Sequence, residues 1–146
     1  MFDINELLSK RNQHDAMNFF ETRKSDKKFD GMNLDEFRVY WNNNREKIEE
    51  LIKNGRYFPD PVKNRTIVTG SGKERVISTM SYLDKFITRL LAQKLNRYLS
   101  EIFQPSSYAY QENKGILDAV HKASTYISQD DKYVVEIDLK NFFDNI

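Results

Sequence analysis

The stretch that decides the fold lies near the end of the chain, where residues 133–146 read YVVEIDLKNFFDNI. Its first part, from Tyr133 to Leu139, is rich in β-branched side chains, which predicts a β-strand. Glu136 and Asp138 interrupt the apolar run on one side of that strand. A carboxylate in such a strand is costly to desolvate unless a partner pairs with it, and a divalent cation is one such partner. Asp138 is therefore a candidate metal ligand, with a helix cap or a surface strand end as the alternatives.

The residues before this stretch predict helices and one hairpin. Residues 65–78 place two β-branched runs around a Gly-Ser-Gly-Lys turn, which predicts a β-hairpin. Apolar residues recur at helical spacing in residues 33–54, 81–99 and 114–127, and one or two short helices are expected within residues 1–20. In the 114–127 helix, the apolar side chains from Ile116 to Ile127 are expected to face inward. The predicted fold class is α+β.

The amino-acid composition excludes several kinds of site and several classes of protein. The chain has 146 residues, which suits one ordinary domain or a piece of a larger one, and 13% are aromatic, which allows a core. The absence of cysteine excludes disulfides and thiolate zinc sites, and two histidines make a histidine metal site improbable. No window is apolar enough for a transmembrane helix, and the first residues lack a signal-peptide core, so export is not expected.

Charge is segregated along the chain. Residues 53–100 hold 10 Lys/Arg and 3 Asp/Glu, a net charge of +7, whereas residues 1–52 carry −2 (9 against 11) and residues 101–146 carry −4 (4 against 8). A phosphate-facing surface beside a carboxylate cluster would give this pattern, and so would chance clustering on solvated helices. Within the basic segment a polar stripe with four-residue spacing consists of Lys85, Arg89, Gln93 and Arg97, and a plain solvent-facing surface is its alternative reading.

Six blocks in order make the chain resemble the N-terminal part of a bacterial reverse transcriptase of the group II intron and retron type. They are KFDGM (28–32), GRYFPDPV (55–62), GKERVI (72–77), YLDK (82–85), FQPSSYAYQENKGILDA (103–119) and VVEIDLKNFFDNI (134–146). The last block resembles the first catalytic motif of the polymerase palm. The resemblance implies an N-terminal extension (1–32), a mostly helical fingers subdomain with the hairpin (33–128) and the start of a truncated palm (129–146).

The resemblance also implies roles for single residues. Asp138 would be the first metal-binding aspartate, holding Mg²⁺ together with the main-chain carbonyl of Leu139. Phe143 would lie under the incoming sugar and exclude a 2′-hydroxyl, with a core aromatic as the alternative. Arg75 would reach the nucleotide triphosphate from the hairpin, and Lys73 would substitute for a lysine that relatives carry where this chain has Thr69.

The chain also carries a basic stripe, and it departs from the pattern of the reverse transcriptase family in several places. Lys85, Arg89 and Arg97 are candidate RNA-binding residues. The family's Gly-Phe-Arg is replaced by the residues 109–111, Ala-Tyr-Gln, and its Asp-Arg by Asp84-Lys85. The Tyr-x-Asp-Asp motif that supplies the remaining catalytic carboxylates is missing, so the sequence predicts a fragment that is inactive alone. Its palm strand would lack most partners, which predicts self-association.

Three functional hypotheses follow from the sequence. The first is the fingers and palm entry of an RNA-directed DNA polymerase of the bacterial cytoplasm, with an RNA template or structured intron or guide RNA, a DNA primer and dNTP as partners and no membrane. The second is a non-catalytic RNA-binding module that uses the N-terminal and basic middle segments. The third is a soluble α+β domain whose strand motif is coincidental, against which the six ordered blocks argue.

Overall fold

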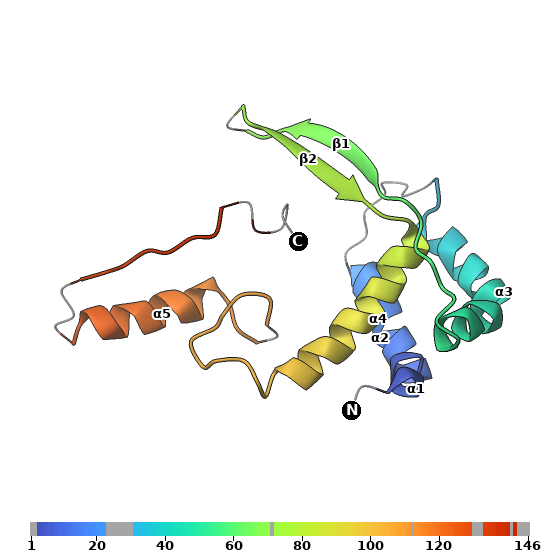
Figure 1. Cartoon of the computed structure of the whole chain (residues 1–146), viewed down its shortest axis with the longest axis horizontal. Helices are drawn as coiled ribbons and strands as arrows, with labels where there is room; N and C mark the ends of the chain where they lie inside the picture. The colour runs from blue at the N-terminus through green and yellow to red at the C-terminus, as the bar shows by residue number, and fades with distance from the viewer. Residues whose placement is uncertain are drawn as a thin grey trace. The chain divides into compact units, whose positions relative to one another are not determined.

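The computed structural model describes residues 3–22, 31–70, 72–111, 113–129, 133–140 and 142 (Figure 1). The described part confirms the α+β class. Its elements are α1 (Ile4–Leu7), α2 (Lys10–Thr22), α3 (Leu34–Lys53), β1 (Lys63–Val68), β2 (Glu74–Thr79), α4 (Tyr82–Leu99) and α5 (Ile116–Ile127). The chain divides into two compact units, Met1–Tyr98 and Leu99–Ile146, and each is described by itself.

The core of the first unit is aromatic. Phe37 of α3 and Phe86 of α4 are fully buried with their ring centroids 5.3 Å apart, and Trp41 lies 4.7 Å from Phe86. Such pairs combine a large buried area with favourable ring geometry. Leu7 of α1 and Ala16 of α2 belong to the same buried cluster. The helices within residues 3–22 therefore share one core with α3 and α4.

Both ends of α3 follow the local signals in the sequence. The Asn33 side chain accepts from the Glu36 N–H at 2.9 Å, and the Glu36 carboxylate accepts from the Asn33 N–H at 2.8 Å, so the two residues form a capping box. At the other end Gly55 adopts φ +63° and the Arg56 N–H donates to the Leu51 carbonyl at 2.8 Å. This is a Schellman stop, in which the left-handed position favours glycine.

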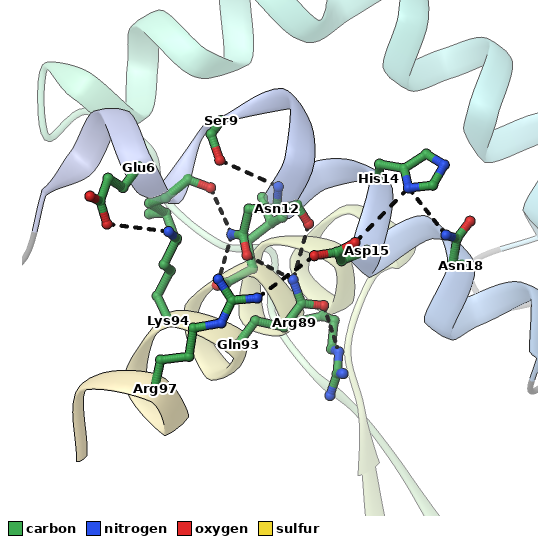
Figure 2. A network of polar contacts seen from close by, with 12 residues as sticks. Glu6, Ser9, Asn12, His14, Asp15, Asn18, Arg89, Gln93, Lys94 and Arg97 are labelled. Carbon is green, nitrogen blue, oxygen red and sulfur yellow. Dashed lines mark hydrogen bonds and ion pairs between the residues drawn. The ribbon is translucent and has the colours of Figure 1, made fainter. Parts of the chain in front are cut away.

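Polar side chains join α2 to α4 (Figure 2). The Gln93 amide, 6% exposed, donates to the Asn12 main-chain carbonyl at 3.0 Å and to the Asn12 side-chain oxygen at 2.8 Å. The Asn12 amide donates in turn to the carbonyls of Leu7 and Leu90, at 2.8 and 3.2 Å. Buried amides are stabilising only when satisfied in this way, so the pair fixes how α2 and α4 dock.

The hairpin is confirmed and is slightly longer than expected. β1 and β2 are antiparallel, with Arg65 opposite Ile77 and Ile67 opposite Arg75. Figure 1 shows the hairpin extending past the helices of its unit, and nearly all of its residues are exposed. Two strands without a covered face are marginal by themselves, so the base of the hairpin needs support from the helices.

The second unit departs from the sequence expectation in two places. The apolar residues of α5 that were expected to face inward are exposed, with Ile116 83%, Leu117 84% and Ile127 61% accessible. Residues 133–139, expected to form a strand, form no strand and no helix. The reason is the same for both segments: within the described residues of this unit nothing pairs with or covers either apolar surface.

None of the described helices combines the length and the apolar character that crossing a membrane requires.

Candidate functional site

The hairpin presents two arginines on one exposed face. In an antiparallel pair, residues opposite each other point to the same side and neighbours along a strand alternate. The register therefore places Arg65 and Arg75 on one face, together with Ile67 and Ile77. We call this surface the arginine face; Lys63 and Thr79 complete it at the base of the hairpin. Its guanidinium groups can fork onto phosphate oxygens, and its isoleucines offer apolar contact between them.

Sequence reasoning identified Arg75 but missed Arg65. The signal was present: with a turn centred on residue 71, the odd-numbered residues of both strands share a face. Reading the register from the turn would have placed the two arginines together. The other face holds the smaller polar and apolar side chains and the only hairpin carboxylate, Glu74.

Lys73, the second candidate on the hairpin, lies in its turn. The Lys73 N–H donates to the Thr69 hydroxyl at 3.2 Å, and the Lys73 carbonyl accepts from the Thr69 N–H at 2.9 Å. Gly72 adopts φ +78°, which favours glycine. Thr69 therefore closes the turn through its hydroxyl, at the position where the family resemblance leads one to expect a lysine.

A buried carboxylate supports the base of the hairpin. Asp84, 5% exposed, accepts from the Tyr57 hydroxyl at 2.5 Å, from the Ser81 hydroxyl at 2.5 Å and from the Asp60 N–H at 3.0 Å. The Asp84 N–H donates to the Ser81 hydroxyl at 3.1 Å, so Ser81 caps the start of α4. Burial raises the pKa of Tyr57 above its usual value of 10, and the hydrogen bond to Asp84 raises it further. Asp84 thus ties the extended segment before β1 to the helix that follows β2.

A pocket of about 540 Å³ lies next to this support. Its lining mixes apolar side chains with hydroxyls and one charge of each sign: Met32, Tyr40, Asp60, Pro61, Val62, Lys63, Thr79, Ser81 and Leu83. Lys63 belongs to both the pocket and the arginine face. The pocket therefore adjoins the hairpin surface that carries the cations.

The polar stripe of α4 lies partly against α2, which corrects the solvent-facing reading for Gln93 but not for Arg97, whose side chain is 56% exposed. Gln93 is buried against Asn12, and the Arg89 Nε donates to the Gln93 side-chain oxygen at 3.0 Å while its guanidinium lies 3.6 Å from the Phe19 ring centre. Arg97 approaches Asp15 at 3.9 Å (Figure 2). Both arginines therefore have partners inside the protein, and a role for Lys85, Arg89 and Arg97 in RNA binding stays a prediction.

Asp138 and Leu139 lie in the irregular segment 133–140 and are exposed, Leu139 by 66%. Phe143 lies outside the described residues. Within the described ranges, no three His, Cys, Asp or Glu side chains gather closely enough to hold a metal ion. A carboxylate and a main-chain carbonyl are oxygen donors of the kind that Mg²⁺ prefers, and Mg²⁺ needs only one or two protein carboxylates when substrate phosphates supply further ligands. The two residues thus fit part of such a site.

Comparison with known protein families gives a match over more than half of the chain. The family model described as reverse transcriptase (RNA-dependent DNA polymerase) matches residues 61–146, which include the hairpin, α4, α5 and the segment with Asp138. No curated protein matches the chain.

Proposed function

The chain belongs to the reverse transcriptase family, and from this membership we propose that it forms the fingers and the palm entry of an RNA-directed DNA polymerase of the bacterial group II intron or retron type. The observation that supports this proposal most is the order of the blocks, with the hairpin arginines ahead of the Asp138 motif. The site of action that fits this type is the bacterial cytoplasm. The substrates would be an RNA template, a DNA primer and dNTP.

In this proposal the arginine face and Asp138 act by positioning charge, and Phe143 acts by its shape. Arg75, with Arg65 beside it, would bind phosphate oxygens of the nucleotide or template from the arginine face. Asp138 and the Leu139 carbonyl would hold Mg²⁺, which when bound supplies charge neutralisation for phosphoryl transfer. Phe143 would select the deoxy sugar by leaving no room for a 2′-hydroxyl.

We propose that these 146 residues alone do not extend a primer. Two-metal phosphoryl transfer holds its ions about 4 Å apart, which takes more than one carboxylate. The printed sequence carries the motif around Asp138 and no Tyr-x-Asp-Asp. A palm strand with that motif would have to come from further polypeptide, in the same chain or in another.

The alternative function is non-catalytic RNA binding. The +7 charge of residues 53–100 and the exposed arginine face favour it, because cations that line one surface neutralise backbone phosphates regardless of sequence. The two functions can be distinguished by the residues that they need. Asp138 and Phe143 matter only for polymerisation, whereas Arg65 and Arg75 would serve both functions.

The experiment for both functions is a salt-dependent titration of the chain with a structured RNA and with a DNA duplex of equal length. We expect binding that prefers RNA, weakens steeply with salt and falls by tenfold or more in an Arg65→Ala/Arg75→Ala variant. Lys47→Ala/Lys53→Ala, which removes two exposed cations from α3, is the matched control. Absence of binding at low salt, or an equal loss in the control, would contradict a nucleic-acid role for the arginine face.

We also propose self-association through residues 133–139. Val134, Val135 and Ile137 are 79–86% exposed in a segment of strand-like composition, and such a segment can pair with a strand edge of another chain. Sedimentation should show a dimer that Ile137→Lys weakens. A monomer across a wide concentration range would contradict self-association.

A further inference from the structure

A second pocket, of about 300 Å³, lies between α2 and α3. Each helix contributes four lining residues: Lys10, Gln13, His14 and Met17 from α2, and Arg38, Trp41, Asn42 and Arg45 from α3. We call it the α2–α3 pocket. It lies outside residues 61–146, so neither the family match nor the proposed polymerase site assigns it a role.

The lining is rich in hydrogen-bond donors and has no carboxylate. Three of its eight residues are Lys or Arg, and none is Asp or Glu. The charge of Arg45 is partly neutralised by Glu49, because the Arg45 Nε donates to the Glu49 carboxylate at 2.7 Å. Burial raises the pKa of Glu49, but the hydrogen bonds from Arg45 and Gln13 outweigh it, so this pKa lies below its ordinary value and Glu49 stays charged. A guanidinium has five N–H donors, so Arg45 still offers others to the pocket.

The charge of Arg38 is also partly neutralised by carboxylates. It pairs with Glu21 and, at 3.4 Å, with Asp35. The Lys10 ammonium, in contrast, has no ion-pair or hydrogen-bond partner among the described residues. Lys10 is therefore the cation of the pocket whose charge the protein does not balance.

Trp41 adds an unused donor to the lining of the pocket. The residue is 3% exposed, and its indole N–H has no hydrogen-bond partner in the described part of the chain. Every fully buried side-chain nitrogen or oxygen there does have a partner. The indole N–H therefore reaches the surface, and the pocket is the surface that Trp41 lines. An indole N–H is a donor only, so at this surface it is available to a ligand that carries an acceptor oxygen.

We propose that the α2–α3 pocket binds a phosphate group, with Lys10 supplying the charge and the Trp41 indole N–H and Arg45 donating hydrogen bonds. A phosphate offers several acceptor oxygens at once, which suits donors that converge from two helices. The volume is at the lower end for ligand sites, so the pocket fits one phosphate and its sugar rather than a large cofactor. The phosphate can belong to an RNA backbone or to a free nucleotide.

The chain carries its own probe for this proposal, because Trp41 is its only tryptophan. A ¹H–¹⁵N correlation spectrum of the labelled 146-residue chain contains a single indole cross-peak. The chain is titrated with inorganic phosphate, adenosine 5′-monophosphate, adenosine and a ten-nucleotide single-stranded RNA. We expect a saturable downfield shift of the indole proton with each phosphate-bearing probe and none with adenosine.

Comparison of the probes identifies the source of the phosphate. Tighter binding of RNA than of the mononucleotide assigns the pocket to a nucleic-acid backbone, and the reverse order assigns it to a free nucleotide. Lys10→Ala should weaken the binding about tenfold, as expected for loss of one charge-assisted hydrogen bond at a partly exposed site. Lys47→Ala, an exposed lysine of α3 outside the pocket, should leave it unchanged.

Three results would overturn the proposal. They are an indole cross-peak that no probe moves, a shift with adenosine equal to that with its monophosphate, and equal weakening by Lys10→Ala and Lys47→Ala. None of them bears on the arginine face, so this proposal and the polymerase proposal fail separately. Both lysines are exposed, so loss of folding is not expected in either variant.

Discussion

Replacement of Asp84 with asparagine is expected to lower the free energy of unfolding of the first unit by about 2 kcal/mol. The buried carboxylate accepts three hydrogen bonds, from two hydroxyls and one main-chain N–H. An asparagine has one acceptor oxygen and turns an NH₂ group toward a donor, so at least one of the three donors loses its partner. A buried donor left without an acceptor costs about 1–3 kcal/mol.

The assay is urea unfolding of the 146-residue chain, followed by the fluorescence of Trp41, which belongs to the same buried cluster as α4. With a slope of about 2 kcal/mol per molar urea, typical of this size, the midpoint should fall by about 1 M without a change in slope. Glu46→Gln neutralises an exposed carboxylate of α3 and should stay within about 0.5 kcal/mol of the parent. A midpoint of Asp84→Asn equal to that of the parent, or an equal loss in Glu46→Gln, would refute the reasoning.

Three further predictions concern single contacts of the same unit. Because folding raises the pKa of Tyr57, the contribution of its hydroxyl to stability is complete below pH 10 and is lost as the pH rises above that value. Tyr57→Phe should therefore lower the free energy of unfolding by about 1 kcal/mol at pH 7 and flatten the decline of the urea midpoint at alkaline pH. An equally steep decline in the parent and in Tyr57→Phe would contradict this prediction. Gln93→Leu should cost about 2–3 kcal/mol in the same assay, because it leaves the buried side-chain oxygen of Asn12 without a donor. An unchanged midpoint would show that the amide pair contributes nothing. Thr69→Val should speed hydrogen exchange at the Lys73 amide, which loses its acceptor, and unchanged exchange would rule out the turn closure described above.

The sequence was sufficient where structure is set by neighbours along the chain. The helix from Leu34 to Lys53 begins at a capping box and is followed by the stop at Gly55, as local patterns predict, because these signals satisfy backbone groups within a few residues. The hairpin follows for the same reason: its turn and its β-branched runs lie next to each other.

The sequence was insufficient where a surface needs a distant partner. Residues 133–139 have strand composition but no strand to pair with among the described residues, and α5 has an apolar stripe with nothing over it. Composition shows that a segment can pair or pack, whereas the partner is a property of the whole fold.

Polar residues with long-range partners were the hardest to assign. Gln93 was interpreted as part of a solvent-facing stripe, yet it is buried because Asn12, 81 positions earlier, satisfies its amide. Asp84 follows Ser81 by three residues, which is the spacing of a helix cap, but its bond to Tyr57 joins two blocks 27 residues apart, which spacing alone does not show.

The measurement that tests the central claim most directly is RNA-templated primer extension by a fusion that joins a palm with the Tyr-x-Asp-Asp strand to Ile146. We predict Mg²⁺-dependent extension by the fusion and none by the 146 residues alone. Asp138→Asn should lower the rate by about a hundredfold or more, as loss of a group that stabilises transition-state charge does, and Glu136→Gln should retain it. Extension that survives in Asp138→Asn, or is lost equally in Glu136→Gln, would contradict the assignment of Asp138 as the first metal-binding aspartate.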